Sequence, residues 1–162
     1  MRSVFVIGVF MMLVTGTEGQ IPRTTSGHFE YTGEMIADNM PIAMEKARAF
    51  FNQPFLVHWD TVAQAGNILV TGRGHINVKA KQHGLSIPSL VPVSLQFSIE
   101  VQNGHYNYRV NHFVVDSKAY NLSFPLEDKP DGLRSTVYDQ LLQNTHKRVS
   151  SVIGWLKRYM EN

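Results

Sequence analysis

The sequence contains no cysteine, and this absence removes several kinds of chemistry at once. The chain cannot form disulfides, bind a metal through thiolates, use a thiol nucleophile or carry a lipid on an N-terminal cysteine. The net charge is also small, since 15 Lys and Arg against 13 Asp and Glu give a formal value of +2. So small and dispersed a charge is not typical of a nucleic-acid-binding surface. The folded state must therefore be stabilised by noncovalent packing.

The only marked hydrophobic run lies at the N-terminus. Arg2 precedes an apolar segment at residues 4–14, and small and polar residues follow up to Gln20. This order is typical of a secretory signal peptide, and the run is shorter than the roughly 20 residues that a membrane-spanning helix needs. We expect residues 1–19 to be a cleaved signal peptide, with cleavage after Gly16 as an alternative site. A retained anchor and a buried N-terminal helix are the other possibilities.

The rest of the chain has the composition of one globular domain. Roughly 140 residues are enough for one hydrophobic core and too few for two ordinary domains. Hydrophobic residues make up 43% of the sequence and charged residues 17%, which excludes wholesale disorder and a multi-span membrane protein. We expect residues 20–27 to form a flexible lead-in and residues 28–162 to form the single domain. Once the signal peptide is removed, no transmembrane helix is expected.

Hydropathy patterns predict a strand, a helix and a hairpin in the first half of the domain. Residues 28–36 alternate between apolar and polar, as in a half-buried strand. Asp38 or Asn39 caps a predicted helix that Pro54 ends, and residues 56–63 and 68–79 are predicted to pair as strands. The helix stripe is Met44, Ala47, Phe50 and Phe51, and the inner face of the second strand is Ile68, Val70, Ile76 and Val78.

Two glycines, Gly72 and Gly74, fall on the same predicted inner face of that strand. Their missing side chains indicate either a bulge or a helix backbone that lies unusually close to the sheet. If the C-terminal helix leaves this place unfilled, an apolar cavity results, as in helix-grip lipid carriers.

The second half of the domain predicts another hairpin and a long helix. Residues 80–92 are expected to form a loop, and residues 93–101 alternate without a break. Asn103 and Gly104 predict a type I′ turn into a partner strand. An irregular connection at residues 118–132 precedes the helix. Leu85, Ile87 and Leu90 of the loop are expected to fold back; Tyr106, Tyr108, Val110 and Val114 to point inward; and Leu133, Val137, Leu141, Val149, Val152, Ile153, Leu156 and Met160 to form the helix stripe.

This order of elements, β-α-β-β-β-β-α, predicts an α+β fold in which two helices pack on one face of an antiparallel sheet. The other face of the sheet is then open to solvent. Its predicted residues are all polar: Thr71, Arg73, His75, Asn77, Lys79, Gln96, Ser98, Glu100, Asn107, Arg109 and Asn111.

The part of the chain from His28 to about Ser117 resembles a family of exported bacterial proteins that share a domain of unknown function with a TBP-like fold. The resemblance rests on patterns of strands and turns: FEYT (29–32), ARAFF (47–51), GNILVTGRG (66–74), SLQFSIEV (94–101) and NGHYNY (103–108). It implies a TBP-like fold and export to the periplasm or cell exterior, in the cell envelope of a Gram-negative bacterium. It implies no activity and no role for any residue.

A TBP-like saddle that binds DNA uses a Lys- and Arg-rich sheet face with apolar wedges. The predicted open face carries Ser, Gln, Glu and Asn and no apolar wedge. We therefore expect no binding to nucleic acid.

Four candidate binding residues lie on neighbouring strands of the predicted open face: Arg73, His75, Lys79 and Arg109. Their charges would suit an anionic sugar, a lipid headgroup or an acidic protein, and an ordinary solvated sheet face is the alternative.

Motifs for catalysis are missing from the sequence. It has no Gly-x-Ser-x-Gly elbow, His-Glu-x-x-His pair, P-loop or Gly-x-Gly-x-x-Gly loop. His58 and Asp60 share a strand face and suit two metal ligands, or a base and its orienting carboxylate, but no third ligand is indicated. His105 and His112 are seven positions apart and should face opposite ways. We expect no catalytic residues, no metal and no cofactor.

The sequence thus predicts a non-enzymatic, exported binding module whose partner is an envelope protein or a small ligand. The alternative is a carrier of a small apolar ligand in a cavity between the sheet and the C-terminal helix.

Overall fold

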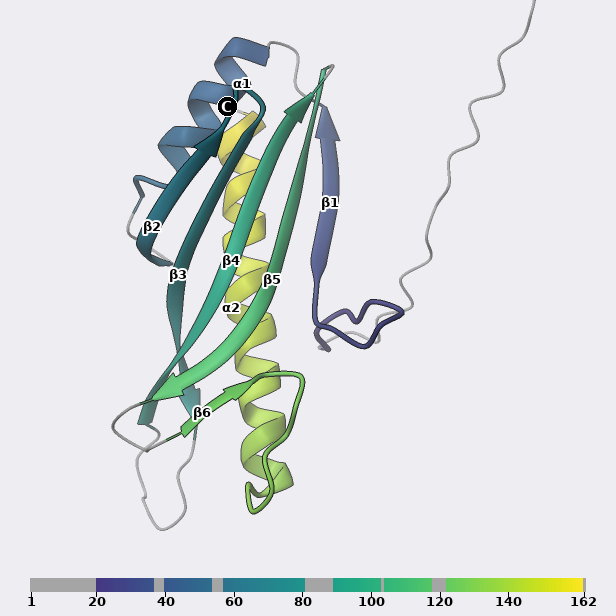
Figure 1. The fold of residues 1–162 in the computed structure, drawn as a ribbon, viewed down its shortest axis with the longest axis vertical. Helices are drawn as coiled ribbons and strands as arrows, with labels where there is room; N and C mark the ends of the chain where they lie inside the picture. The colour runs from purple at the N-terminus through teal and green to yellow at the C-terminus, as the bar shows by residue number, and fades with distance from the viewer. Residues whose placement is uncertain are drawn as a thin grey trace, which may run out of the picture.

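The structure is a computed structural model that describes residues 20–36, 40–53, 57–80, 89–102, 104–117 and 122–161. The predicted signal peptide lies outside the described residues, as do Asp38, Asn39, Pro54, Leu85 and Ile87. The elements in chain order are β1 (Tyr31–Ile36), α1 (Met40–Phe50), β2 (His58–Ala65), β3 (Leu69–Ala80), β4 (Ser89–Gln102), β5 (His105–Ser117), β6 (Leu122–Pro125) and α2 (Ser135–Glu161) (Figure 1).

The described strands form one antiparallel sheet in the order β1-β5-β4-β3-β2, and β6 pairs with the end of β5. Both predicted hairpins, β2 with β3 and β4 with β5, are present. Gln102 lies opposite His105, which leaves two residues for the connecting turn. Gly104 has a φ of 81°, the left-handed conformation that a type I′ turn requires.

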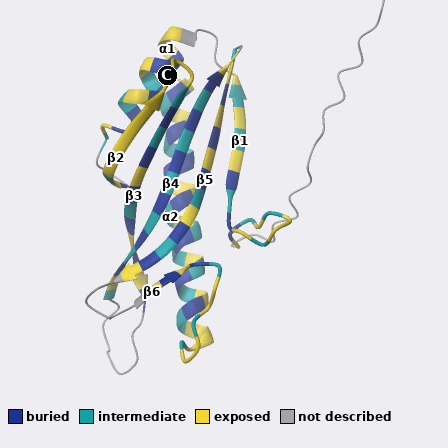
Figure 2. Ribbon diagram, in the orientation of Figure 1, coloured by how far each residue is buried: buried dark blue, intermediate teal, exposed yellow. Residues whose placement is uncertain are grey.

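Both helices lie on the same face of the sheet, as predicted, with α2 running along its length (Figure 1). The alternation of buried and exposed residues along the strands is visible in Figure 2. The α2 residues that face the sheet recur at helical spacing and form one stripe. They are Tyr138, Leu141, Thr145, Val149, Val152, Ile153, Leu156 and Met160. The predicted two-layer α+β fold is therefore confirmed.

An aromatic group joins the two layers. The Phe50 ring, at the end of α1, lies 5.3 Å from the Phe97 ring of β4 and 5.1 Å from the Trp155 ring of α2, measured between centroids. The next residue, Phe51, packs against Trp59 of β2 at 4.8 Å. One end of α1 therefore links the sheet to α2 through ring contacts.

The two inward glycines make room for this group and for a bulge in β2. A Cβ on Gly72 would lie 2.5 Å from the Phe51 ring and 2.9 Å from Trp59, while a Cβ on Gly74 would overlap the carbonyl oxygen of His58. The register of β2 against β3 shifts between Trp59 and Thr61, beside Gly74. The bulge prediction is confirmed. The atoms nearest to Gly72 and Gly74 belong to Phe51, Trp59 and the β2 backbone, and not to the backbone of a helix or to the C-terminal helix.

The second bulge corrects the predicted inner face of β5. The register of β4 against β5 shifts between Ser94 and Gln96, and His112 takes a φ of 55°. Because the extra residue reverses the alternation, Phe113 is buried beyond it and Val114 is only half-buried. Val114 was therefore wrongly predicted to point inward.

Other corrections concern the ends of strands. Ile68 lies in the β2–β3 turn and is 44% exposed, so it is not part of the inner face. Leu90 belongs to β4 and is 59% exposed instead of folding back on the domain. The connection predicted to be irregular contains β6, a strand too short to show a period of two. Leu126, the residue after β6, accepts a 2.7 Å hydrogen bond at its carbonyl from the hydroxyl of Tyr138.

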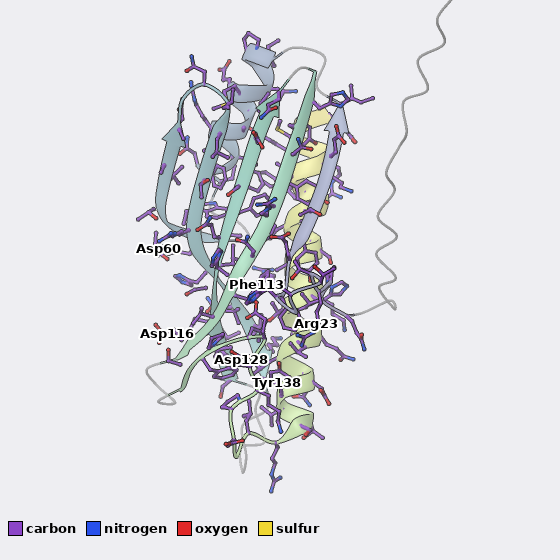
Figure 3. All side chains as sticks on the ribbon, turned by 45° about the vertical axis from the view of Figure 1, so that its right-hand side comes forward. Arg23, Asp60, Phe113, Asp116, Asp128 and Tyr138 are labelled. Atoms are coloured by element: carbon purple, nitrogen blue, oxygen red, sulfur yellow. The ribbon has the colours of Figure 1, made fainter. Side chains whose placement is uncertain are left out.

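The lead-in predicted to be flexible packs onto the domain. Ile21 is 6% exposed, and the Arg23 guanidinium lies 4.1 Å above the Phe29 ring. The Glu30 amide donates a 3.0 Å hydrogen bond to the carbonyl of Pro22. Arg23 is labelled in Figure 3, on this loop. In the part of the chain that the structure describes, the core therefore begins at Ile21 and not at His28. The sequence did not indicate this, because a single apolar residue among polar neighbours shows no periodicity.

Alanine at the two inward glycines should destabilise the protein to different degrees. At Gly72 the added methyl group meets the side chains of Phe51 and Trp59, which can shift, and we expect a loss of about 1–3 kcal/mol. At Gly74 it meets backbone, so the loss should be larger. Urea unfolding checks both values.

Gly154→Ala is the matched control. This glycine lies inside α2, where a Cβ has room, and alanine there should raise the free energy of unfolding by about 0.5–1 kcal/mol. Equal effects of the alanine substitutions at positions 72 and 154 would contradict the packing described here.

Candidate functional site

Among the described residues, the sheet face opposite the helices is not covered by another element (Figure 1). Residues that lie directly opposite each other in an antiparallel pair share a face. The register places Thr71 opposite Ser98 and Ser98 opposite Arg109, so these residues share the open face. The same pairing confirms the whole predicted set, none of which is buried: Thr71, Arg73, His75, Asn77, Lys79, Gln96, Ser98, Glu100, Asn107, Arg109 and Asn111.

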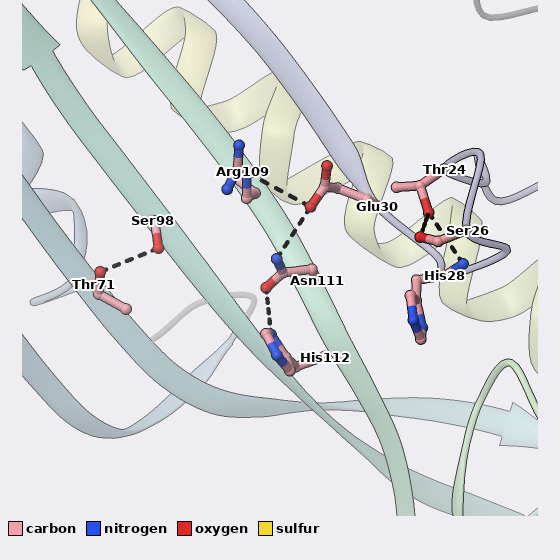
Figure 4. A network of polar contacts seen from close by, with 9 residues as sticks. All are labelled: Thr24, Ser26, His28, Glu30, Thr71, Ser98, Arg109, Asn111 and His112. Carbon is pink, nitrogen blue, oxygen red and sulfur yellow. Dashed lines mark hydrogen bonds and ion pairs between the residues drawn. The ribbon is translucent and has the colours of Figure 1, made fainter.

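Cross-strand hydrogen bonds orient several of these side chains. The hydroxyls of Thr71 and Ser98 lie 3.1 Å apart (Figure 4), and the Nε of Arg73 donates to Oε1 of Gln96 at 3.1 Å. Each bond joins β3 to β4. The middle of the open face is therefore partly ordered by its own contacts.

A larger network joins the start of β1 to β5 (Figure 4). The carboxylate of Glu30, only 23% exposed, lies 3.6 Å from Nε of Arg109. Its Oε2 also accepts a 3.2 Å hydrogen bond from Nδ2 of Asn111. The other end of the Asn111 amide, Oδ1, lies 2.7 Å from Nδ1 of His112. We call these four residues the Glu30 network.

The Glu30 network also orients the hydrogen bond to His112. Nδ2 of Asn111 donates to Glu30, so the other end of the amide, Oδ1, faces His112. An amide oxygen can only accept, so Nδ1 of His112 donates this bond. His112 is exposed, so the rest of its ring is accessible to a partner.

The backbone of His112 adds a second unusual feature. Its φ of 55° lies in the left-handed region, where a residue with a Cβ is uncommon. Such conformations persist only where the surrounding structure holds them, and both they and β-bulges occur often at functional sites. In this protein the left-handed residue, His112, follows Asn111 directly and is hydrogen-bonded to it.

A second polar cluster lies at the other bulge, at the β2 edge of the sheet. His58 lies opposite His75, with 4.9 Å between the ring centroids, and Oδ2 of Asp60 is 3.5 Å from Nδ1 of His75. Asp60 is labelled at this edge in Figure 3. His58 and Asp60 thus both reach His75. In the part of the chain that the structure describes, no group of three or more His, Asp or Glu side chains is arranged to hold a metal ion.

The four candidate cations are all on the open face, but three of them already have partners. Arg73 bonds to Gln96, His75 contacts Asp60, and Arg109 pairs with Glu30. Lys79 is exposed, and its backbone carbonyl accepts a 2.6 Å hydrogen bond from Asn144 of α2. These residues do not converge on one point, and the carboxylates between them give the face a mixed charge.

The place where the sequence allowed an apolar cavity is filled. The Phe51 ring and Trp59 occupy the space over Gly72, and the β2 backbone occupies the space over Gly74. The glycines therefore accommodate packing and give no support to an apolar-ligand carrier at this position.

The described groups with shifted pKa values lie on the helical side of the sheet. Burial raises the pKa of Tyr31, Tyr106, Tyr108 and Tyr138 and lowers the pKa of His146. The hydroxyl of Tyr31 lies 2.9 Å from Nδ1 of His146, which ties β1 to α2. These shifts are consequences of packing, because the groups sit between the two layers.

Sequence reasoning missed Glu30 and His112 as site residues and treated His105 and His112 as opposed on a regular strand. His105 lies on the open face, 3.2 Å from Glu34 of β1, while His112 occupies the bulge. No local signal marks Glu30, because its partners are on a strand far away in the sequence. The register of β1 against β5 creates the network.

The chain matches no known family model and no curated protein. It is similar to two solved structures. A TBP-like protein from Parabacteroides distasonis gives a TM-score of 0.66 at 10% identity, covering 86% of this chain and 96% of the other. A DUF4468 family protein from Bacteroides ovatus gives a TM-score of 0.65 at 10% identity, covering 90% and 92%. The chain therefore has a TBP-like fold, as the resemblance implied. Among its described helices, none is long and apolar enough to cross a membrane.

Acid should destabilise this protein through His146. Burial holds the folded-state pKa below the ordinary value of 6.5, so the unfolded chain binds this proton more readily. The stabilisation by the neutral ring is fully present above pH 6.5 and is lost as the pH falls through the lower folded-state pKa. His146→Gln should flatten this dependence in urea unfolding below pH 6.5. The exposed His105→Gln is the control, and an identical slope for both variants would contradict the assignment.

Proposed function

We propose that this protein is an exported, non-enzymatic binding module of the cell envelope, and that it recognises another protein through the open face of its sheet. The Glu30 network is the observation that carries this proposal. It holds polar side chains in place on a surface that no other described element covers, with the exposed ring of His112 beside them. Side chains that are already ordered lose less entropy on binding, so such a surface favours recognition.

The charge of the open face supports a protein partner. Arg73 and Lys79 share the face with the carboxylates of Glu34 and Glu100. Surfaces with both signs of charge are complementary to other mixed surfaces and gain specificity from matching pairs. A polyanion such as nucleic acid prefers clustered cations, and the Arg109–Glu30 pair reduces that attraction further.

Export is supported by the N-terminal sequence. Residues 1–19 contain the charged residue, short apolar run and small residues of a signal peptide. Ile21 is buried, so cleavage before Gln20 would retain every described core residue in the mature chain. The composition is compatible with an oxidising compartment because there is no cysteine to mispair.

Photo-crosslinking in the native host tests the binding face. A photoreactive residue at Ser98 should capture one partner protein, whereas the same residue at Ser150, exposed on α2, should not. Arg109→Glu places a like charge beside Glu30 and should reduce the Ser98 cross-link about tenfold. Equal capture from both positions, or a cross-link unaffected by Arg109→Glu in a folded variant, would refute recognition by this face.

N-terminal sequencing of the protein from fractionated host cells tests export separately. The mature chain should be found in the envelope or periplasmic fraction and begin at Gln20. A start at Thr17 would move the cleavage site to the alternative position. A chain that stays in the cytoplasm with Met1 or Arg2 at its start would refute export and leave the binding face untouched.

A further inference from the structure

Among the described residues, no strand pairs with the outer edge of β2. β2 is the last strand in the sheet order and, among the described strands, pairs only with β3. Every residue of β2 is exposed except Trp59, which is half-buried, and Val62 is 50% exposed. Both faces and the outer edge of this strand therefore contact solvent along residues 61–65.

Within β2, residues 61–65 lack the features that normally prevent edge pairing. Edge strands are usually protected by charged residues, proline or a bulge. Residues 61–65 read Thr-Val-Ala-Gln-Ala, with no charge, proline or glycine. The bulge and Asp60 lie just before this segment, and Gly66 with a φ of 60° begins the turn just after it. A five-residue pairing segment is thus bounded on both sides.

We propose that two copies of this chain pair antiparallel through β2, so that their sheets join across a twofold axis at Ala63. This register places Thr61 opposite the partner's Ala65, Val62 opposite the partner's Gln64, and Ala63 opposite the partner's Ala63. The bulge of one copy then falls beyond the end of the other copy's pairing segment. All paired residues come from the exposed, uncharged stretch.

Several observations favour a second copy as the occupant. The uncharged segment at residues 61–65 does not repel an identical segment, although the whole chain carries a net charge of +2. The residues on the open-face side, Thr61, Ala63 and Ala65, are small enough for two copies to approach closely. On the other side, pairing covers the exposed Val62. A twofold contact also closes on itself, because each copy offers the same segment.

The other free edge is a poorer partner for β2. β1 carries the charged Glu34, and a charged side chain on an edge strand disfavours pairing with another strand. A head-to-tail contact of β2 with β1 would leave free edges at both ends and build a growing row of copies. The symmetric contact instead removes both β2 edges and produces one continuous sheet with the two open faces side by side.

Single-cysteine cross-linking tests the register directly, because the natural chain has no cysteine. Directly opposed residues of an antiparallel pair have Cα atoms about 4.5–5.5 Å apart, within the range that a disulfide spans. Under mild oxidation, Ala63→Cys should form a disulfide-linked dimer much faster than Ser150→Cys, the exposed α2 control. Equal rates for the two variants would overturn the proposed axis.

Solution mass provides the second test. Light scattering of the mature wild-type protein should show a concentration-dependent dimer. Ala63→Lys places two like charges at the axis and should raise the dimer dissociation constant at least about tenfold, while Ser150→Lys, with the same added charge, should not change it. A wild type that remains monomeric at about 0.5 mM, a mass above two copies, or a dimer unaffected by Ala63→Lys would overturn the proposal. Far-UV circular dichroism confirms that each variant is folded.

Discussion

Burial of one apolar face of the sheet is the interaction on which the rest of the structure depends. With no cysteine to cross-link the chain, the free energy of folding comes from covering the inner side chains of β3, β4 and β5 with α1 and α2. Phe97 lies at the centre of this contact and meets both Phe50 and Phe51. The close packing of these rings explains why glycine occupies positions 72 and 74, where a side chain would displace an aromatic ring or the β2 backbone.

This one-sided burial also determines where binding is possible. Because both helices pack on one face, the opposite face keeps its polar residues, and no other described element covers it. The two bulges then concentrate polar side chains at particular points of that face. One gathers Asp60 with His75, and the other presents His112 beside Asn111. A flat sheet would have kept these side chains in regular rows, whereas the bulges change their direction and bring them into contact.

The open face and the β2 edge are separate surfaces with different chemistry. The face is polar and charged, so it suits selective recognition of an unlike partner. The segment at residues 61–65 is neutral and offers backbone groups, which suit pairing with a strand of the same kind. Pairing through this edge would leave the open face uncovered, so both contacts are compatible in one assembly.

The sequence by itself determined the fold class, both hairpins and the polar character of the open face, because periods of two and of about 3.6 residues are local properties. It also indicated a bulge near Gly72 and Gly74. Only the tertiary structure decided which face Phe113 and Val114 take, where Ile21 packs, and that Glu30 meets Arg109 and Asn111. These features depend on strand register and on contacts between segments distant in sequence. A one-residue shift in pairing reverses every later side chain, and no local pattern encodes such a shift.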